Sequence, residues 1–268
     1  MFNLKGKTAI ITGASGFLGK SMCEALLQYN CNIEIYGRGL KMLKFAENLQ
    51  DRYRRNKVSA RIVDLYNEKE FKEQLKESIK DNKKIDILIN NAFDFSKDTG
   101  FNDNSGRFEN MNKEIFMKGM ESGLYWAFLA TQIIGEQMKK QKSGSIINIS
   151  SMYGHVSPDP LLYEETETFN PPIYSIVKSG LFGLTKYTAS FYGKYNIRCN
   201  SISPGAFPNT TGENKPNEKI LDRLIKKIPL GRVGNPEDLK GAIIFLASDA
   251  SEYVTGTDIK VDGGFAII

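Results

Sequence analysis

Residues 7–19 read KTAIITGASGFLG, and this stretch decides the fold. Its first half is a short apolar run typical of a buried strand, and its second half places glycines at positions 13, 16 and 19 where a helical pattern begins. Such glycines allow a tight turn and a close approach of backbone N–H groups to a pyrophosphate, which the helix N-terminus also favours. We favour nucleotide binding at this turn. The alternative is a tight turn with a structural role only. The residues expected to contact the nucleotide here are Gly13, Ser15, Gly16, Phe17, Leu18 and Gly19.

The same alternation of apolar runs and helical patterns continues along the whole chain. Strands are predicted at 7–12, 32–36, 58–63, 85–89, 145–149, 197–202 and 257–261. Helices are predicted near 17–29, 40–54, 67–80, 111–140, 173–193, 217–227 and 236–247. This order predicts an α/β fold, a single Rossmann-type doubly wound parallel sheet of about seven strands with helices on both faces. Because no linker-like segment or repeat interrupts the pattern, residues 1–268 are expected to form one dinucleotide-binding domain.

Long connections are predicted at the edge of the sheet where a ligand would bind. Residues 92–110 follow the fourth strand and residues 152–172 follow the fifth. In open α/β sheets, ligands bind beyond the carboxyl ends of the strands. We therefore expect these two loops, together with residues 206–228, to shape the substrate site.

Composition and charge exclude several other classes of protein. With 41% hydrophobic and 25% charged residues, the chain is an ordinary globule, and the net charge of +5 is too mild and too scattered for a nucleic-acid partner. No window reaches the roughly 18 apolar residues of a membrane span. Three separated cysteines and one histidine predict no structural zinc and a reducing compartment. Since the first residues resemble no targeting segment, we expect a cytoplasmic protein.

The end of the second strand bears on the choice of cofactor. An acidic side chain there would bind the ribose 2′-hydroxyl of NAD(H) and repel a 2′-phosphate. The chain has Tyr36-Gly37-Arg38 instead, and the guanidinium of Arg38 could pair with that phosphate. NADP(H) is therefore the preferred cofactor, with NAD(H) possible. Asp64, just past the third strand, either accepts a bond from the adenine amino group or caps the following turn.

Three polar residues form a candidate catalytic group. Tyr174 and Lys178 are four residues apart on a predicted helix, so they share one face. A neighbouring ammonium would favour the phenolate of the tyrosine and move its pKa towards neutral pH. Ser151 closes the fifth strand, where its hydroxyl could hold a substrate oxygen as negative charge develops.

Together with the glycine turn, further motifs make the chain resemble the short-chain dehydrogenase/reductase family over nearly its whole length. They are Asn90-Asn91-Ala92, Ile149-Ser150-Ser151, Tyr174 with Lys178, Pro204-Gly205, and the tail PLGRVGNPEDLKGAIIFLASDASEYVTGTDIKVDGG. The resemblance implies an oxidoreductase in which Ser151 orients a carbonyl, Tyr174 exchanges the proton, and Lys178 lowers the tyrosine pKa and binds the nicotinamide ribose. It implies further cofactor contacts at Asn91, Ala92, Tyr174, Pro204, Gly205 and Phe207. It also implies a homodimer or homotetramer formed through the last helix and strand.

The chain departs from the family pattern at four places. The glycine spacing T-G-x-x-G-x-x-G is that of the family's larger sugar-nucleotide enzymes, whereas the tail is similar to the compact reductases. Phe93 stands where glycine is usual. Gly123 replaces an asparagine that serves a proton relay in many members, although its carbonyl could still hold a water. Ser151 and Tyr174 are 23 positions apart, more than is usual.

The extra length lies in residues 159–170, DPLLYEETETFN, which carry four acids and two aromatic residues. These side chains suit hydroxyls, an amine or a ring, while a solvated acidic loop is the alternative. The loop is similar to one in reductases of bacterial surface-sugar pathways, so a sugar-like substrate of surface-glycan synthesis is predicted. His155 either packs locally or contacts the substrate.

The sequence therefore predicts an NADP(H)-dependent oxidoreductase that interconverts a secondary alcohol and a ketone in a small molecule. A 3-ketoacyl-type reductase is the first alternative, although no helix is obviously basic enough to dock an acidic carrier. A non-catalytic nucleotide-binding module is the second alternative. It would be expected to lack Ser151, Tyr174 or Lys178, and all three are present.

Overall fold

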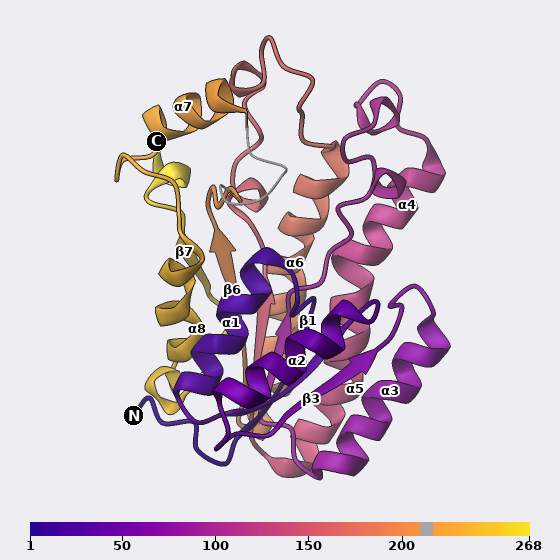
Figure 1. The fold of residues 1–268 in the computed structure, drawn as a ribbon, viewed down its shortest axis with the longest axis vertical. Helices are drawn as coiled ribbons and strands as arrows, with labels where there is room; N and C mark the ends of the chain where they lie inside the picture. Colours follow the sequence, from indigo (N-terminus) through magenta and orange to yellow (C-terminus); the bar gives the residue numbers. More distant parts are fainter. Residues whose placement is uncertain (210–216) are drawn as a thin grey trace.

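A computed structural model of the protein describes residues 1–209 and 217–268, and its centre is one parallel sheet of seven strands. The spatial order is β3-β2-β1-β4-β5-β6-β7 (Figure 1). The strands are β1 (Thr8–Thr12), β2 (Asn32–Gly37), β3 (Val58–Ile62), β4 (Ile87–Asn90), β5 (Gly144–Ile149), β6 (Ile197–Pro204) and β7 (Asp258–Val261). The predicted fold class is confirmed, and the chain order reverses beside β1, where this fold opens a crevice for a nucleotide.

Helices cover both faces of the sheet. They are α1 (Phe17–Gln28), α2 (Lys41–Arg52), α3 (Glu68–Asn82), α4 (Lys113–Met120), α5 (Trp126–Gln141), α6 (Pro172–Tyr192), α7 (Glu218–Lys226) and α8 (Lys240–Ala247). Figure 1 shows α1, α2 and α8 on one face and α3, α5 and α6 on the other. Consecutive residues of a strand point to opposite faces of the sheet. Ile11 therefore packs in the hydrophobic core under α1, α2 and α8, and Ile10 packs in the core under α3, α5 and α6. Both side chains are fully buried, each contributing about 1.5–3 kcal/mol.

The predicted helix 111–140 is confirmed as an unbroken helical segment from Lys113 to Gln141, with one local departure from α-helical geometry. A π-helical turn at Glu121–Tyr125 separates α4 from α5. At this point α6 packs directly on the backbone of the segment. A Cβ at Gly119 would approach Ile173 to 2.4 Å, and one at Gly123 would approach Val177 to 2.3 Å. Gly123 is thus a close-packing position in this fold.

Replacing Gly123 by asparagine is therefore expected to disturb packing. We expect Gly123→Asn to lose about 1–3 kcal/mol of stability in urea unfolding, because the core there has no room for a side chain. Gly183→Asn on α6 is the matched control, since an added Cβ at Gly183 meets nothing within 4 Å. A Gly123→Asn variant as stable as the wild type would show that the position is open to a relay residue.

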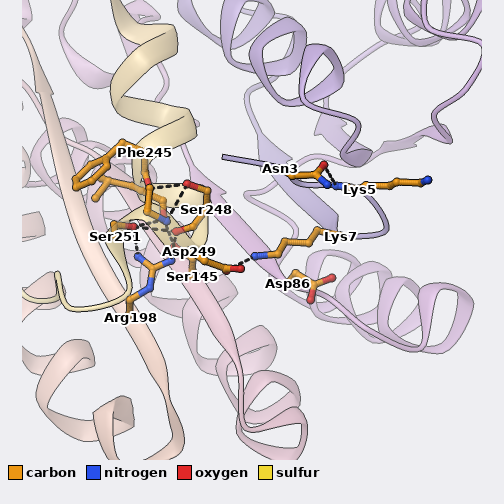
Figure 2. Close-up of polar contacts among 12 residues, drawn as sticks. Asn3, Lys5, Lys7, Asp86, Ser145, Arg198, Phe245, Ser248, Asp249 and Ser251 are labelled. Atoms are coloured by element: carbon orange, nitrogen blue, oxygen red, sulfur yellow. Dashed lines mark hydrogen bonds and ion pairs between the residues drawn. The ribbon is translucent and has the colours of Figure 1, made fainter. Parts of the chain in front are cut away.

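The amino ends of the strands are held together by a polar cluster, shown in Figure 2. Lys7 Nζ donates to Asp249 Oδ1 at 2.6 Å, which links the start of β1 to the turn after α8. The guanidinium of Arg198, near the start of β6, donates to Ser251 Oγ at 2.6 Å and to the Ser248 carbonyl at 3.1 Å. These contacts fix the end of the sheet opposite the carboxyl ends of the strands.

The long connections lie where they were expected, beyond the carboxyl ends of β4, β5 and β6. The loop after β4 contains two short 3-10 turns, Lys97–Thr99 and Asn104–Gly106. The loop after β5 contains another two, Met152–Gly154 and Pro160–Leu162. Of the predicted substrate loop 206–228, residues 210–216 lie outside the described residues.

Candidate active site

The glycine turn after β1 is bonded to the turn after β4. Thr12 Oγ1 accepts the backbone N–H groups of Asn91 and Ala92, both at 3.1 Å. The Asn91 side-chain amide donates to the carbonyls of Thr12 at 3.2 Å and Gly13 at 3.0 Å. Gly13 has a φ of +65°, and a Cβ there would lie 2.8 Å from Ala92 Cα. Asn91 therefore shapes the site by holding the glycine turn.

A single cavity of about 680 Å³ opens at this turn. It is lined by every predicted site residue except Asp64, namely Gly13, Ser15, Gly16, Phe17, Leu18, Gly19, Arg38, Asn91, Ala92, Ser151, Tyr174, Lys178, Pro204, Gly205 and Phe207. Residues that were not predicted as site residues complete the wall: Gly37, Val63, Leu65, Phe93, Phe95, Trp126, Ile149, Ser150 and Asn209. The glycine turn and the N-terminus of α1 can hold a pyrophosphate at one end, while the polar triad lies in the same cavity.

Asp64 caps the turn that follows β3, as the second of its two predicted roles requires, and its contact with the adenine stays a prediction. Its side chain is exposed, and Oδ1 accepts the backbone N–H of Tyr66 at 3.2 Å. The neighbours Val63 and Leu65 line the cavity instead. The apolar side chains on either side of Asp64 thus form the wall beyond β3.

Ser151, Tyr174 and Lys178 are brought together by β5 and the first turns of α6. Pro172 occupies the first turn of α6, a favourable position because proline lacks only an N–H that no helix residue accepts. Ser150 Oγ donates to the Lys178 carbonyl at 2.8 Å, which fixes α6 against the end of β5. Lys178 is only 4% exposed, and its ammonium donates to the Ile149 carbonyl at 2.8 Å.

Burial has the largest effect on the pKa values of Tyr174 and Lys178. Burial raises the pKa of Tyr174, and the hydrogen bond with Ser151 lowers it only in part. Burial also lowers the pKa of Lys178 from 10.5 to about 8. The proposed effect of the Lys178 ammonium on the tyrosine pKa is not among the causes of this shift and stays a prediction. A phenol that keeps its proton at neutral pH is the form that can protonate a developing alkoxide.

Phenylalanines of the loop after β4 surround the ring of Tyr174. The ring centroids of Phe93, Phe95 and Phe101 lie 5.3, 5.8 and 5.6 Å from that of Tyr174. Lys178 Nζ lies 5.4 Å from the centroid of Phe93. We call the side chains of Phe93, Phe95 and Phe101 the phenylalanine wall. The sequence signal was three phenylalanines within nine residues of an otherwise polar loop, which the sequence analysis did not use.

The acidic insertion 159–170 binds α7 through several of its residues. Asp159 pairs with Lys227, and Glu165 pairs with Lys219 at 2.8 Å. Arg223 donates to the Glu164 carbonyl at 2.6 Å. None of the described residues lining the cavity comes from this insertion.

These contacts change one sequence-based expectation. Asp159 and Glu165 are engaged by lysines, so they are not directed at a substrate as the insertion hypothesis required. The basic residues of α7 and its C-cap are Lys219, Arg223, Lys226 and Lys227, and the helix also carries the acids Glu218 and Asp222. The insertion partly neutralises that basic surface.

The aromatic and histidine side chains near the insertion also find local partners. Tyr163 contacts the hydroxyl of Tyr153 at 2.8 Å, and Phe169 packs under Arg107 with 4.7 Å between guanidinium carbon and ring centroid. His155 Nε2 lies 2.8 Å from Asp258 Oδ2, and its ring packs on Phe182. The local role is therefore the one that the structure supports for His155.

A second cavity of similar size, about 690 Å³, lies between α4, α5 and α6. Its lining is mostly apolar and includes Met117, Leu124 and Phe128. Among the described residues that line it, Glu121 is the charged residue. It offers no acid–base group beside a nucleotide turn, so we place the chemistry in the first cavity. Residues 1–209 and 217–268 contain no cluster of His, Cys, Asp or Glu placed to hold a metal ion. Among the helices described, none is both long and apolar enough to cross a membrane.

Known proteins share both the sequence pattern and the fold. A family profile described as enoyl-(acyl carrier protein) reductase matches residues 13–266. The chain is 32% identical to the 3-oxoacyl-[acyl-carrier-protein] reductase FabG of Thermotoga maritima, over 98% of this chain and 99% of that one. It is also 32% identical to the sorbose reductase of Schizosaccharomyces pombe, over 99% and 98% of the two chains.

A solved structure extends this similarity to three dimensions. The gluconate 5-dehydrogenase of Burkholderia cenocepacia, in complex with NADP and tartrate, superposes with a TM-score of 0.86 at 25% identity. The match covers 100% of this chain and 98% of that one. With the full-length matches above, this chain belongs to the short-chain dehydrogenase/reductase family and is an NAD(P)-dependent oxidoreductase of alcohols and ketones.

Proposed function

We propose that the protein is an NADP(H)-preferring reductase of a small cyclic or sugar-like ketone, in which Ser151, Tyr174 and Lys178 carry the catalysis. The carrying observation is that all three side chains line the cavity that begins at the glycine turn. A dinucleotide fits the residues present, since Gly13 has the positive φ that this turn requires and α1 begins at Phe17.

The proposed roles follow from geometry and protonation. When bound, the nicotinamide cofactor supplies or accepts the hydride. Ser151 Oγ holds the carbonyl oxygen of the substrate, and Tyr174 Oη gives that oxygen its proton during reduction. The Lys178 ammonium, charged below a pKa of about 8, stabilises the negative charge that remains on the phenolate.

The phenylalanine wall supports a substrate with one apolar face. Phe93 and Phe95 line the cavity beside Tyr174, and all three rings of the wall pack against the Tyr174 ring. A pyranose or cyclic polyol presents C–H groups on one face and hydroxyls on its rim, so it can pack on such rings while Ser151 binds an oxygen. One relative is named as a reductase of the sugar sorbose, and this name supports a sugar-like substrate for the present protein.

A 3-oxoacyl substrate is the second candidate, favoured by the similarity to FabG. The phenylalanine wall would also suit an acyl chain. Against a carrier-bound substrate stands the pairing of Lys219 and Lys227 with acids of the insertion, which leaves α7 a weaker site for an acidic carrier. Activity with free keto-sugars but not with acyl thioesters would favour the first candidate, and the reverse would favour the second.

Arg38 provides the test of the proposed cofactor preference. We expect Arg38→Ala to weaken NADPH binding about 10- to 100-fold, because a charged hydrogen bond to phosphate contributes about 1.5–3 kcal/mol. NADH lacks the 2′-phosphate, so its Kd should change little. Fluorescence titration of both cofactors measures this, with Arg55→Ala on the exposed surface as control. Equal weakening of both cofactors would contradict the proposal.

A further inference from the structure

The carboxylate of Asp94 lies beside Arg38, which is a residue of the cavity wall. The side chain of Asp94 is only 4% exposed, while that of Arg38 is 58% exposed. Arg38 Nη2 lies 3.6 Å from Asp94 Oδ1, and Arg38 itself lines the cavity. The end of β2 carries no acid, whereas this one is delivered by the loop after β4.

Several contacts hold Asp94 in place. Tyr66 Oη donates to Oδ2 at 3.0 Å, and the backbone N–H of Ser96 donates to Oδ1 at 3.1 Å. Thr99 Oγ1 donates to the Asp94 carbonyl at 2.7 Å. The carboxylate therefore has fixed donors on both oxygens and does not need Arg38 to be satisfied.

Tyr66 is itself fixed by its neighbours. Its ring packs edge-on against Trp126, with centroids 4.8 Å apart, and Lys118 Nζ lies 4.1 Å from the ring centroid. Burial, followed by the Asp94 charge, raises the pKa of Tyr66, so its hydroxyl keeps the proton that it donates. Lys118 is the other cation at this cluster, and it contacts the ring of Tyr66.

This arrangement places a fixed negative charge next to the guanidinium that we propose for the 2′-phosphate. A phosphate bound to Arg38 would lie close to this carboxylate and would be repelled by it. NAD(H) brings no such charge to Arg38. A like charge at a binding site is a means of discriminating between two related ligands.

We infer that Asp94 is a specificity-determining residue that weakens the preference for the 2′-phosphate and so keeps NAD(H) in use as a second cofactor. The inference rests on the proposed role of Arg38. It concerns the relative affinity of the two cofactors and leaves the proton-transfer residues untouched.

The test is the ratio of the Kd values of NADH and NADPH, measured by fluorescence titration on the whole protein. We expect Asp94→Asn to raise this ratio about tenfold in favour of NADPH, which corresponds to about 1.4 kcal/mol. Asp86→Asn is the matched control, because Asp86 is also a buried carboxylate but lies at the amino end of the sheet. It should leave the ratio unchanged.

A double-mutant cycle shows whether Asp94 acts through Arg38. In the Arg38→Ala background the 2′-phosphate is no longer held beside the carboxylate, so Asp94→Asn should change the ratio much less than in the wild type. If the Asp94→Asn variant does not fold, the double variant Tyr66→Phe/Asp94→Asn replaces it. This double variant also removes the Tyr66 hydroxyl, which donates to Asp94 Oδ2 in the wild type. We expect the same rise in the ratio of the two Kd values.

Two results would overturn the inference in distinguishable ways. If Arg38→Ala discriminates between the cofactors but a folded Asp94→Asn variant keeps the wild-type ratio, Asp94 has no such role and the proposed function stands. If Arg38→Ala weakens both cofactors equally, the role of Arg38 fails and the inference about Asp94 fails with it.

Discussion

Tyr174→Phe is expected to lower kcat by about 10²- to 10⁴-fold, the range contributed by a positioned general acid. The phenol keeps its proton at neutral pH because burial raises its pKa, so this hydroxyl is available to protonate the substrate oxygen. Phenylalanine retains the ring that packs against the phenylalanine wall. The Kd of NADPH should therefore stay close to that of the wild type.

Tyr187→Phe is the matched control for this variant. Tyr187 lies on the same helix, α6, with its side chain exposed, so removing its hydroxyl should change neither kcat nor stability. Steady-state NADPH oxidation with an accepted ketone measures both variants. A Tyr174→Phe variant with most of its turnover intact would refute the proton-transfer role.

Lys178→Met is expected to lose activity and gain stability at the same time. Removing one preorganised donor that stabilises developing charge costs about 10²- to 10³-fold in kcat. The ammonium is buried, and its pKa falls from 10.5 to about 8 on folding. That shift corresponds to about 3 kcal/mol at pH 7, from which about 1 kcal/mol is subtracted for the lost hydrogen bond to the Ile149 carbonyl. We therefore expect the variant to be more stable by about 2 kcal/mol at pH 7.

The stability gain should depend on pH with a defined sign. Because the folded pKa is lower than the unfolded one, the unfolded chain binds the extra proton between pH 8 and 10.5. The wild type thus gains stability as the pH rises through this window, and the advantage of Lys178→Met shrinks. Urea unfolding at pH 7 and pH 9.5 measures it, with the exposed Lys186→Met as control. If the stability difference between Lys178→Met and the wild type stays constant with pH, Lys178 does not carry a buried charge with a lowered pKa.

Local sequence patterns predicted most of the fold. Strands such as β1 are short apolar runs between turns, and their predicted bounds differ from the structure by at most two residues. The glycine turn was predictable because its glycines, strand and helix are adjacent in sequence. The π-helical turn at Glu121–Tyr125 was not predicted, and it lies where Ile173 and Val177, distant in sequence, pack on glycines 119 and 123.

The candidate site was predictable where it depends on motifs and unpredictable where it depends on long-range partners. Tyr174 and Lys178 share a helix face by spacing alone, but the burial that sets their pKa values comes from elements far away in sequence. The Asp94–Arg38 pair joins two loops, and the pairs of the insertion join it to α7. The sequence shows which residues are charged, but it does not show which oppositely charged residue lies beside each of them in the fold.

The central claim is that Tyr174 transfers a proton in a cavity that also binds NADPH. A screen of NADPH and NADH consumption over keto-sugars, acyl ketones and steroid-like ketones tests it most directly, when the wild type and Tyr174→Phe are compared at equal cofactor occupancy. The account predicts that the wild type consumes NADPH with at least one ketone, and that the variant binds NADPH equally well without turning it over. Equal rates for the two proteins, or a wild type that binds neither cofactor, would contradict the account.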